Sequence, residues 1–341
     1  MRPTAKRLLW TAGILLLLAA AAGTTGYLLL TRSITPRNSI VFLPEGTTFP
    51  ALCDTLAAEG RIARPGRFRT VARAMGADRH VRPGRYELRT GMSARRLASM
   101  FRSGNQSPLR ISFNNIRTMP QLAAALGRQL CADSAAFAAM LHDDSLAAGY
   151  GFRPAEFIGM FVPDTYEVYW TVSPEGFAER MHREYNRFWN DDRRERLRRT
   201  GLTEKEVATL ASILDEETNR TDEMPVMAGV YINRLRRGMP LQADPTVKYA
   251  VGDFTLKRIL NKHLQVDSPY NTYRHAGLPP GPIRMPSVAA LDAVLGYAEH
   301  DYLYFCARAD FSGYHAFART LAEHNRNARS YTSALDRLGI R

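Results

Sequence analysis

The longest apolar stretch of the chain lies close to its N-terminus. Leu8–Leu30 is an uncharged run of 23 residues, and a helix of this length would extend about 35 Å, enough to cross a bilayer core of about 30 Å. A cleaved signal peptide is the alternative, with Leu8–Ala19 as its apolar core and the small residues 20–23 near the cut. Because the apolar run continues beyond any such cut, we predict an uncleaved anchor at 8–30.

Basic residues flank this run on both sides. Three precede it and two follow it: Arg2, Lys6, Arg7, Arg32 and Arg37. This small asymmetry favours a cytoplasmic tail at 1–7 and an exported C-terminal part. Residues 31–39 form a short polar linker, and no other stretch is long enough to span a bilayer.

Strand and helix patterns alternate over residues 40–113. The expected strands are 40–43, 84–88 and 109–113, and the expected helices are 49–59, 67–75 and 93–101. Proline–glycine pairs at 65–66 and 83–84 mark turns between them. This pattern predicts a small α+β module.

From residue 114 to 341 the pattern is mainly helical. Apolar residues recur at intervals of three and four in segments 121–130, 134–141, 174–189, 192–199, 203–218, 223–237, 245–251, 287–300 and 321–338. The aromatic run 302–307 is a candidate strand. Residues 265–286 are irregular and rich in proline, which is typical of a functional loop. The fold class is therefore α+β, with a transmembrane helix, a small α+β module and a mainly helical domain with few strands.

Composition and charge limit the classes of function that the chain can have. The chain has 341 residues, of which 45% are apolar, and its cysteines are Cys53, Cys131 and Cys306. This excludes a disulfide-stapled scaffold and a cysteine-based metal motif. The net charge is +13, and residues 60–110 hold 13 arginines against two acids. The charge is thus concentrated in the module next to the anchor, where anionic lipid headgroups or a glycan strand could meet it.

One helix carries a candidate catalytic acid. Residues 203–218 begin with a capping box, and their apolar face continues to Glu217 at helical spacing, whereas Glu216 follows the polar face and Asp215 lies at the flank. An apolar environment would raise the pKa of Glu217 and suit it to donate a proton. In the alternative interpretation these acids are solvated, or paired with Arg220 or Arg234.

Other polar residues have two interpretations each. Asp244 precedes Pro245 as a helix cap, and Asn233 is a cap or a substrate contact. Tyr270 to Tyr273, including Asn271, offer aromatic faces and an amide for a sugar, or a loop packed on the core. His315 and Phe317 line a site or are structural. The sequence has none of the usual motifs of phosphate-binding loops, metal sites or serine hydrolases, so we expect no metal and no cofactor.

At these residues the chain resembles the MltG (YceG-like) family of membrane-anchored endolytic murein transglycosylases. The matching segments are PDTY (163–166), ASILDEET (211–218), YINRL (231–235), LQADPTVKYA (241–250), SPYNTY (268–273), GLPPGPI (277–283), YLYF (302–305), HAF (315–317) and EHN (323–325). The resemblance covers the chain from the anchor to the last helix. It implies a LysM-like module at 40–113 and a catalytic domain at 114–341.

The resemblance also implies an activity and a site. The family's catalytic acid falls on Glu217, which would cleave the β-1,4 bond between N-acetylmuramic acid and N-acetylglucosamine and leave a 1,6-anhydro end. Residues that the matching segments place near the substrate are Asp215, Asn233, Gln242, Asp244, Asn271, Tyr273, Pro280, His315 and Phe317. The chain departs from the family with Asp215 in place of Glu, and with Ala243 where Thr is common.

The implied setting is the outer (periplasmic) side of the cytoplasmic membrane. The expected partners are peptidoglycan glycan strands, the anionic lipid surface and peptidoglycan synthases. A non-catalytic peptidoglycan-binding scaffold is the alternative, supported by the Asp215 departure. Export argues against the nucleic-acid binding that the arginines would otherwise suggest. A pyridoxal-phosphate lyase would need a lysine that forms a Schiff base, and none of the five lysines lies in a suggestive place.

Overall fold

The protein folds into two structural units. The computed structural model describes residues 3–256 and 258–339. The first unit runs to Ile111 and includes the short segment Glu167–Val172, and the second contains Ser112–Tyr166 and the chain from Ser173 onward. The chain therefore crosses between the units more than once.

The first unit begins with the long helix α1 (Pro3–Thr31). Within it, Trp10–Thr31 is long and apolar enough to cross a membrane. Most of its side chains are exposed, whereas Leu28–Leu30 near its end are partly buried and Leu30 packs against the core of the unit. Helix α1 is the one helix with such a span in the described part of the chain. This confirms the expected N-terminal apolar helix.

Beyond α1, the first unit is a two-stranded sheet packed on three helices. Strand β1 (Ser39–Leu43) pairs antiparallel with β2 (Gly84–Leu88), with Val41 opposite Tyr86. One face of this hairpin is buried, and it packs with apolar side chains of α2 (Phe49–Ala58), α3 (Pro65–Ala74) and α4 (Ala94–Ser103). Alternation along the strands and the helical spacing of apolar residues together account for this core. Strand β3 (Leu109–Ser112) leads out of the unit.

The second unit is mainly helical. Its first elements are α5 (Met119–Gly127), α6 (Ser134–Leu141), α7 (Asp144–Gly149), the 3₁₀ helix η1 (Pro154–Met160), α8 (Pro174–Phe188) and α9 (Asp191–Thr200). Strand β4 (Thr165–Val168) lies where the chain passes back into the first unit, and it pairs with β3. They are followed by α10 (Glu204–Glu217), α11 (Met224–Arg236), α12 (Asp244–Val251), η2 (His263–Gln265), α13 (Val288–Leu295), β5 (Tyr304–Ala307), β6 (His315–Ala318) and α14 (Leu321–Arg337). Strands β5 and β6 form an antiparallel hairpin.

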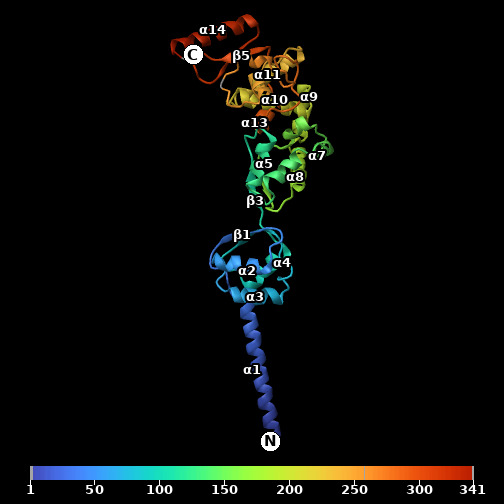
Figure 1. Ribbon diagram of the computed structural model, residues 1–341, viewed down its shortest axis with the longest axis vertical. Helices are drawn as coiled ribbons and strands as arrows, with labels where there is room; N and C mark the ends of the chain where they lie inside the picture. The colour runs from blue at the N-terminus through green and yellow to red at the C-terminus, as the bar shows by residue number, and fades with distance from the viewer. Residues whose placement is uncertain (1–2, 257, 340–341) are drawn as a thin grey trace. The chain divides into compact units, whose positions relative to one another are not determined.

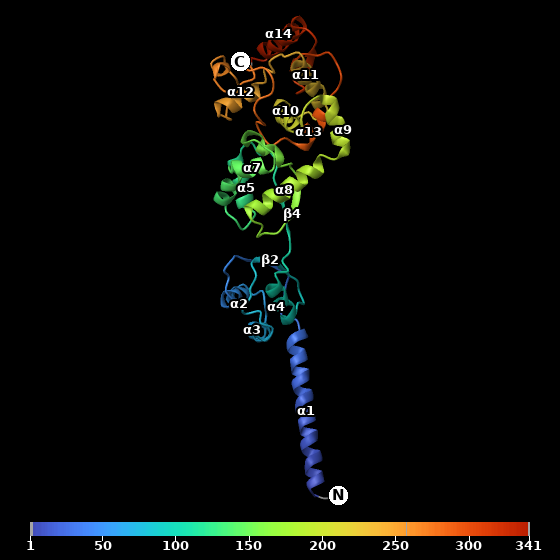
Figure 2. The same cartoon turned by 90° about the vertical axis from the view of Figure 1, so that its right-hand side faces the viewer.

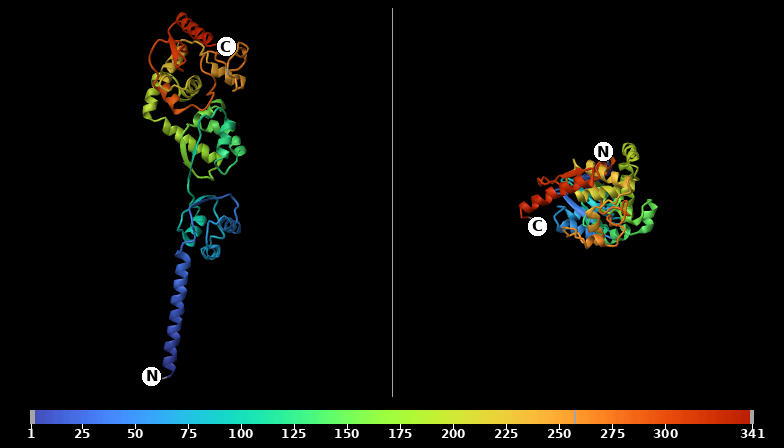
Figure 3. Two further views of the ribbon diagram at one scale, coloured as in Figure 1. Left: turned by 90° about the vertical axis from the view of Figure 1, so that its left-hand side faces the viewer. Right: turned by 90° about the horizontal axis from the view of Figure 1, so that it is seen from above.

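Helix α10 forms the centre of this unit. Every residue from Val207 to Leu214 is buried, and α10 contacts α11, α13, α12 and η1. Figure 2 shows α10, α11 and α13 next to one another, and Figure 3 shows α14 and the segment around α12 on different sides of them. A helix buried on all sides fixes the position of whatever its last turn carries.

The observed fold confirms a mixed α/β protein that is mostly helical with few strands. Most expected elements are present within a few residues of their predicted ends. Sequence patterns missed α7, η1, β4, η2 and β6, which are short. The LysM-like character of the first module stays a prediction.

A close backbone approach in the second unit gives a test of this packing. A Cβ on Gly229 of α11 would lie 2.3 Å from the carbonyl oxygen of Ala298 and 2.6 Å from Nε2 of His300. Gly229→Ala should therefore lower the free energy of unfolding by about 2 kcal/mol, despite alanine's better helix propensity. Thermal unfolding of the full chain in detergent measures this loss.

Gly149→Ala is the matched control. Gly149 ends helix α7 in the same unit, and a Cβ there would meet no atom within 4 Å. We expect no loss of stability for this variant, and an equal loss in both would contradict the packing described.

Candidate active site

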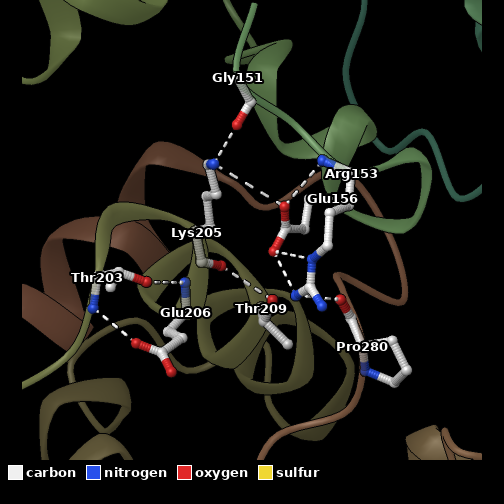
Figure 4. A network of polar contacts seen from close by, with 8 residues as sticks. All are labelled: Gly151, Arg153, Glu156, Thr203, Lys205, Glu206, Thr209 and Pro280. Atoms are coloured by element: carbon white, nitrogen blue, oxygen red, sulfur yellow. Dashed lines mark hydrogen bonds and ion pairs between the residues drawn. The ribbon is translucent and has the colours of Figure 1, made fainter. Parts of the chain in front are cut away.

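The start of α10 is fixed by a network of polar contacts (Figure 4). Thr203 and Glu206 form a capping box, in which the Glu206 carboxylate accepts the Thr203 backbone N–H at 2.8 Å. Lys205 donates to the carbonyl oxygen of Gly151 and lies 4.0 Å from the Glu156 carboxylate, which Arg153 also binds. These contacts anchor the helix whose other end carries three successive acids.

Glu216 is held by two arginines. Nη2 of Arg117 lies 2.6 and 2.7 Å from its two carboxylate oxygens, and Nη1 of Arg284 lies 2.8 Å from Oε1. All three side chains are at least two-thirds buried. Through these two guanidinium groups, Glu216 ties α10 to the chain before α5 and to the chain before α13.

Asp215 binds the residue that caps the neighbouring helix α13 (Val288–Leu295). Its carboxylate oxygens accept the backbone N–H and the hydroxyl of Ser287, each at 2.6 Å. Ser287 in turn is the N-cap of α13 and accepts the Ala290 N–H at 3.1 Å. Burial raises the pKa of Asp215, and the Ser287 donors partly offset this effect. Asp215 is therefore bound to the protein rather than open to a ligand.

Glu217 has the opposite environment. It makes one side-chain hydrogen bond in the described structure, which it accepts from the Tyr231 hydroxyl at 2.7 Å. Desolvation raises the pKa of its carboxyl from 4.5 to about 7; the nearby Asp244 and Glu216 charges add to this rise, while the Tyr231 hydrogen bond and the Arg234 charge oppose it. Glu217 can thus hold or release a proton near neutral pH.

A cleft of about 300 Å³ opens over Glu217. Its lining includes Glu217, Tyr231, Arg234, Leu241, Gln242, Asp244, Tyr273, Tyr304, Phe305, Leu321 and His324. These residues come from α10, α11, the start of α12 and the chain just before it, the segment 268–273, β5 and α14. Aromatic rings beside polar groups are suited to a sugar, whose ring has apolar faces and hydroxyl edges.

Arg234 is a buried cation at the back of this cleft. It is 8% exposed, and it donates to the carbonyl oxygens of Leu303 at 2.6 Å and Leu241 at 2.9 Å. In the described part of the chain no carboxylate lies within ion-pair distance of it, and burial lowers its pKa. Its charge favours the ionised form of Glu217 and so helps the acid to give up its proton.

One part of the cleft wall is a strained loop fixed by threonines. Gln242 has a left-handed backbone with φ of 51°, and its N–H donates to the Thr272 carbonyl oxygen at 3.1 Å. The Thr272 hydroxyl accepts the Ala243 N–H at 3.0 Å and contacts the Thr246 hydroxyl at 2.8 Å. Backbone strain of this kind is often found at functional sites. These bonds join the segments 241–246 and 268–273 beside the acid.

Asp244 faces the cleft with its own partner. Its carboxylate accepts the Tyr273 hydroxyl at 2.6 Å, and burial raises the pKa of Tyr273. Among the described residues no cluster of His, Cys, Asp and Glu could hold a metal ion.

Comparison with known proteins places this arrangement in a family. The YceG-like family model matches residues 41–330, most of the chain. The chain belongs to the YceG-like family. An endolytic murein transglycosylase from Bacillus subtilis is 28% identical over 86% of this chain and 84% of its own length. Another from Streptococcus pneumoniae is 25% identical over 94% of this chain and 64% of its own length.

A solved structure of this YceG-like family supports the fold. The crystal structure of a yceG-like protein from Listeria monocytogenes has 27% sequence identity and a TM-score of 0.55, covering 86% of this chain and 99% of that chain. The family resemblance expected from the sequence motifs is confirmed.

The structure brings some of the predicted site residues together. Gln242, Asp244 and Tyr273 line the cleft with Glu217. Asp215 does not, because Ser287 occupies its carboxylate.

The other predicted residues make internal contacts outside the cleft lining. Asn233 donates to the His300 and Tyr302 carbonyl oxygens, and the buried Asn271 to those of Leu264 and Val266. Pro280 lies in the network of Figure 4, and Phe317 stacks on Tyr302 with 5.7 Å between ring centres.

His315 holds the loop that follows the acid. Its Nδ1 lies 2.8 Å from the carboxylate of buried Glu223, and its backbone N–H donates to the same carboxylate at 2.8 Å. Arg220 of this loop donates to the Ser312 carbonyl oxygen at 2.7 Å. The hairpin β5–β6 therefore fixes the loop after Glu217.

Sequence reasoning did not single out several cleft residues. Tyr231, Tyr304, Phe305 and His324 line the cleft. In the sequence they stand out only as members of the segments that match the family. Tyr231 lies three residues before Arg234, one helical turn away, so a prediction that Arg234 faces the acid would also have found Tyr231.

The raised pKa of Glu217 makes stability depend on pH. Because its folded pKa of about 7 exceeds the ordinary 4.5, the folded state holds the proton more tightly, and the free energy of unfolding falls as the pH rises between these values. Glutamine keeps the neutral form at every pH. Glu217→Gln should therefore gain stability over the wild type from about pH 5 to about pH 8, by about 3 kcal/mol. Thermal unfolding at a series of pH values measures this; a difference independent of pH would contradict it.

Proposed function

We propose that this protein is a peptidoglycan lytic transglycosylase that cleaves glycan strands internally. The observation that carries the proposal is one desolvated, protonatable carboxyl, Glu217, at the base of an aromatic and polar cleft. Membership of the YceG-like family and relatives named endolytic murein transglycosylase support it.

The first step would be protonation of the leaving group. Glu217 donates its proton to the β-1,4 glycosidic oxygen as the bond from C1 of N-acetylmuramic acid breaks. With a pKa of about 7, the carboxyl is partly protonated at neutral pH, as a general acid must be. The carboxylate then formed is stabilised by the Tyr231 hydroxyl and by the positive charge of Arg234.

The second step would close a ring within the substrate. The Glu217 carboxylate takes the proton from the C6 hydroxyl of the same muramic acid residue, whose oxygen bonds to C1 and gives a 1,6-anhydro end. Because no water attacks, the reaction needs no second catalytic carboxylate, in contrast to common glycoside hydrolases. The other cleft carboxylate, Asp244, has Tyr273 as its partner and is assigned a binding role.

The proposed setting follows from the apolar helix. We infer that α1 anchors the protein in the cytoplasmic membrane, with its N-terminus in the cytoplasm and the two units on the outer side. Nascent peptidoglycan strands would be the substrate. The synthases that make these strands would be neighbours of the protein in the membrane.

Replacing the acid gives the direct test. Glu217→Gln should abolish 1,6-anhydro products from uncrosslinked glycan strands, a loss of about a thousandfold or more, because an amide cannot donate the required proton. Mass spectrometry of the digest measures the products. Glu206→Gln on the same helix is the control, because glutamine also completes a capping box, and it should retain activity. Anhydro products from the Glu217→Gln protein at the wild-type rate would refute the assignment. A wild-type protein that binds strands without cleaving them would indicate a scaffold.

Removing the hydroxyl that faces the acid gives a second test. The Tyr231 hydrogen bond lowers the pKa of Glu217, so Tyr231→Phe should raise that pKa. The alkaline limb of the kcat/KM profile should then move up by about one pH unit. Tyr297→Phe is the control, because the Tyr297 hydroxyl binds Arg236 outside the cleft. A limb that moves equally in both variants, or in neither, would contradict the role given to Tyr231.

A further inference from the structure

A second cleft lies in the first unit, beside helix α4. It measures about 540 Å³, within the usual range for small-ligand sites. Its lining combines three arginines with several hydroxyl and amide groups: Arg89, Arg95, Arg96, Ser93, Ser99 and Ser103 face it, together with the loop 105–108. The proposed reaction makes no use of this cleft.

The charge of the cleft is not neutralised by the protein. Arg89, Arg95 and Arg96 have no carboxylate within ion-pair distance in the part of the chain that the structure describes. Glu87, the acid in the lining, is bound by Arg85 at 2.8 Å. Other arginines of this unit do have acidic partners, such as Arg69 with Asp54 at 2.8 Å. An anion bound in the cleft would therefore neutralise the positive charge of these arginines.

The cleft lies beside the end of the apolar helix. The chain that leaves α1 is hydrogen-bonded along the loop that carries Arg89 and leads into α4. The Ile34 N–H donates to the Met92 carbonyl oxygen at 2.8 Å, and the Thr35 hydroxyl donates to that of Arg89 at 2.7 Å. Helix α1 also contacts α4 itself, and Figures 1 and 2 show α1 entering the unit on the side of α3 and α4.

These bonds fix the height of the cleft above a membrane. The apolar span ends at Thr31, so its end would lie at the level of the lipid headgroups. Ser33 forms a β-bridge with Ser93, the N-cap of α4. Arg95 and Arg96 follow in the first turn of that helix, close in sequence and space to the point where α1 would leave the bilayer.

Guanidinium groups and hydroxyls match a phosphate group. Arginine binds phosphate oxygens through two parallel N–H donors, and serine hydroxyls add single donors. A phosphate is therefore the chemistry that this lining fits, and the nearest source for an anchored protein is the headgroup of an anionic phospholipid.

We propose that the α4 cleft binds the phosphate headgroup of an anionic phospholipid through Arg89, Arg95 and Arg96. This inference rests on the proposed membrane anchoring and not on the proposed reaction. A bound headgroup would hold the first unit against the membrane surface, so that the arginine-rich module acts through one defined site rather than through its total charge.

Hydrogen exchange of the full chain in nanodiscs tests this proposal. With phosphatidylglycerol mixed into phosphatidylcholine, exchange in residues 89–108 should slow about tenfold or more relative to phosphatidylcholine alone. Replacing Arg89, Arg95 and Arg96 together by glutamine should remove the effect. Replacing the same three by lysine keeps the charge but loses the paired donors, and should give an intermediate effect.

The matched control removes equal charge elsewhere in the unit. Arg64, Arg73 and Arg79 are exposed and lie outside the cleft lining. Their triple replacement by glutamine should keep the phosphatidylglycerol effect, whereas its loss there would show general electrostatic attraction and overturn the proposal. Glu217→Gln should also keep it, which separates lipid binding from catalysis.

Two further arms identify the source of the anion. Equal protection by inorganic phosphate in phosphatidylcholine nanodiscs would assign the cleft to free phosphate. Protection by uncrosslinked glycan strands but not by phosphatidylglycerol would assign it to the glycan. Either result overturns the proposal, as does equal protection in phosphatidylcholine alone.

Discussion

The site depends on the removal of one carboxyl from water. Three acids end the same helix, and they differ in the partners that the fold gives to their carboxylates. Glu216 receives two arginines and Asp215 receives a serine, so both are satisfied by the protein. Glu217 receives one tyrosine hydroxyl, and desolvation then raises its pKa to about 7. The proposed general acid thus differs from the two preceding acids because they have protein partners for their charge, whereas Glu217 has one tyrosine hydroxyl.

The difference between Asp215 and the usual Glu of the family is understandable in these terms. The position binds the N-cap residue of α13, and the shorter carboxylate accepts two donors from Ser287 at 2.6 Å each. Hydrogen bonds to a carboxylate are short and strong, as these two are. The substitution that offered support for a degenerate scaffold therefore leaves a well-formed contact and weakens that alternative.

Helical periodicity predicted the parts of the protein that local sequence determines. It located α10 and the phase of Glu217, because a buried helix needs an apolar face and Glu217 continues that face. It could not reveal how Arg234 is held near the acid, since one of its partners is the Leu303 carbonyl oxygen 69 residues away. Nor could it reveal that the hairpin β5–β6 fixes the following loop, since Arg220 binds Ser312, 92 residues away. The strands β4 and β6 were missed for a similar reason: four residues carry too little alternation, and pairing with a distant strand stabilises them.

Charge shows the same dependence on distant contacts. The excess of arginine between residues 60 and 110 is visible in the sequence, but its meaning is not, because some of these arginines are neutralised by acids and others are not. The structure separates the two groups and places three unpaired members in one cleft near the end of α1. An electrostatic argument based on net charge would spread the attraction over the whole module. The proposed lipid contact would instead concentrate the attraction where the proposed anchor emerges, and orientation on the membrane would then depend on a few side chains.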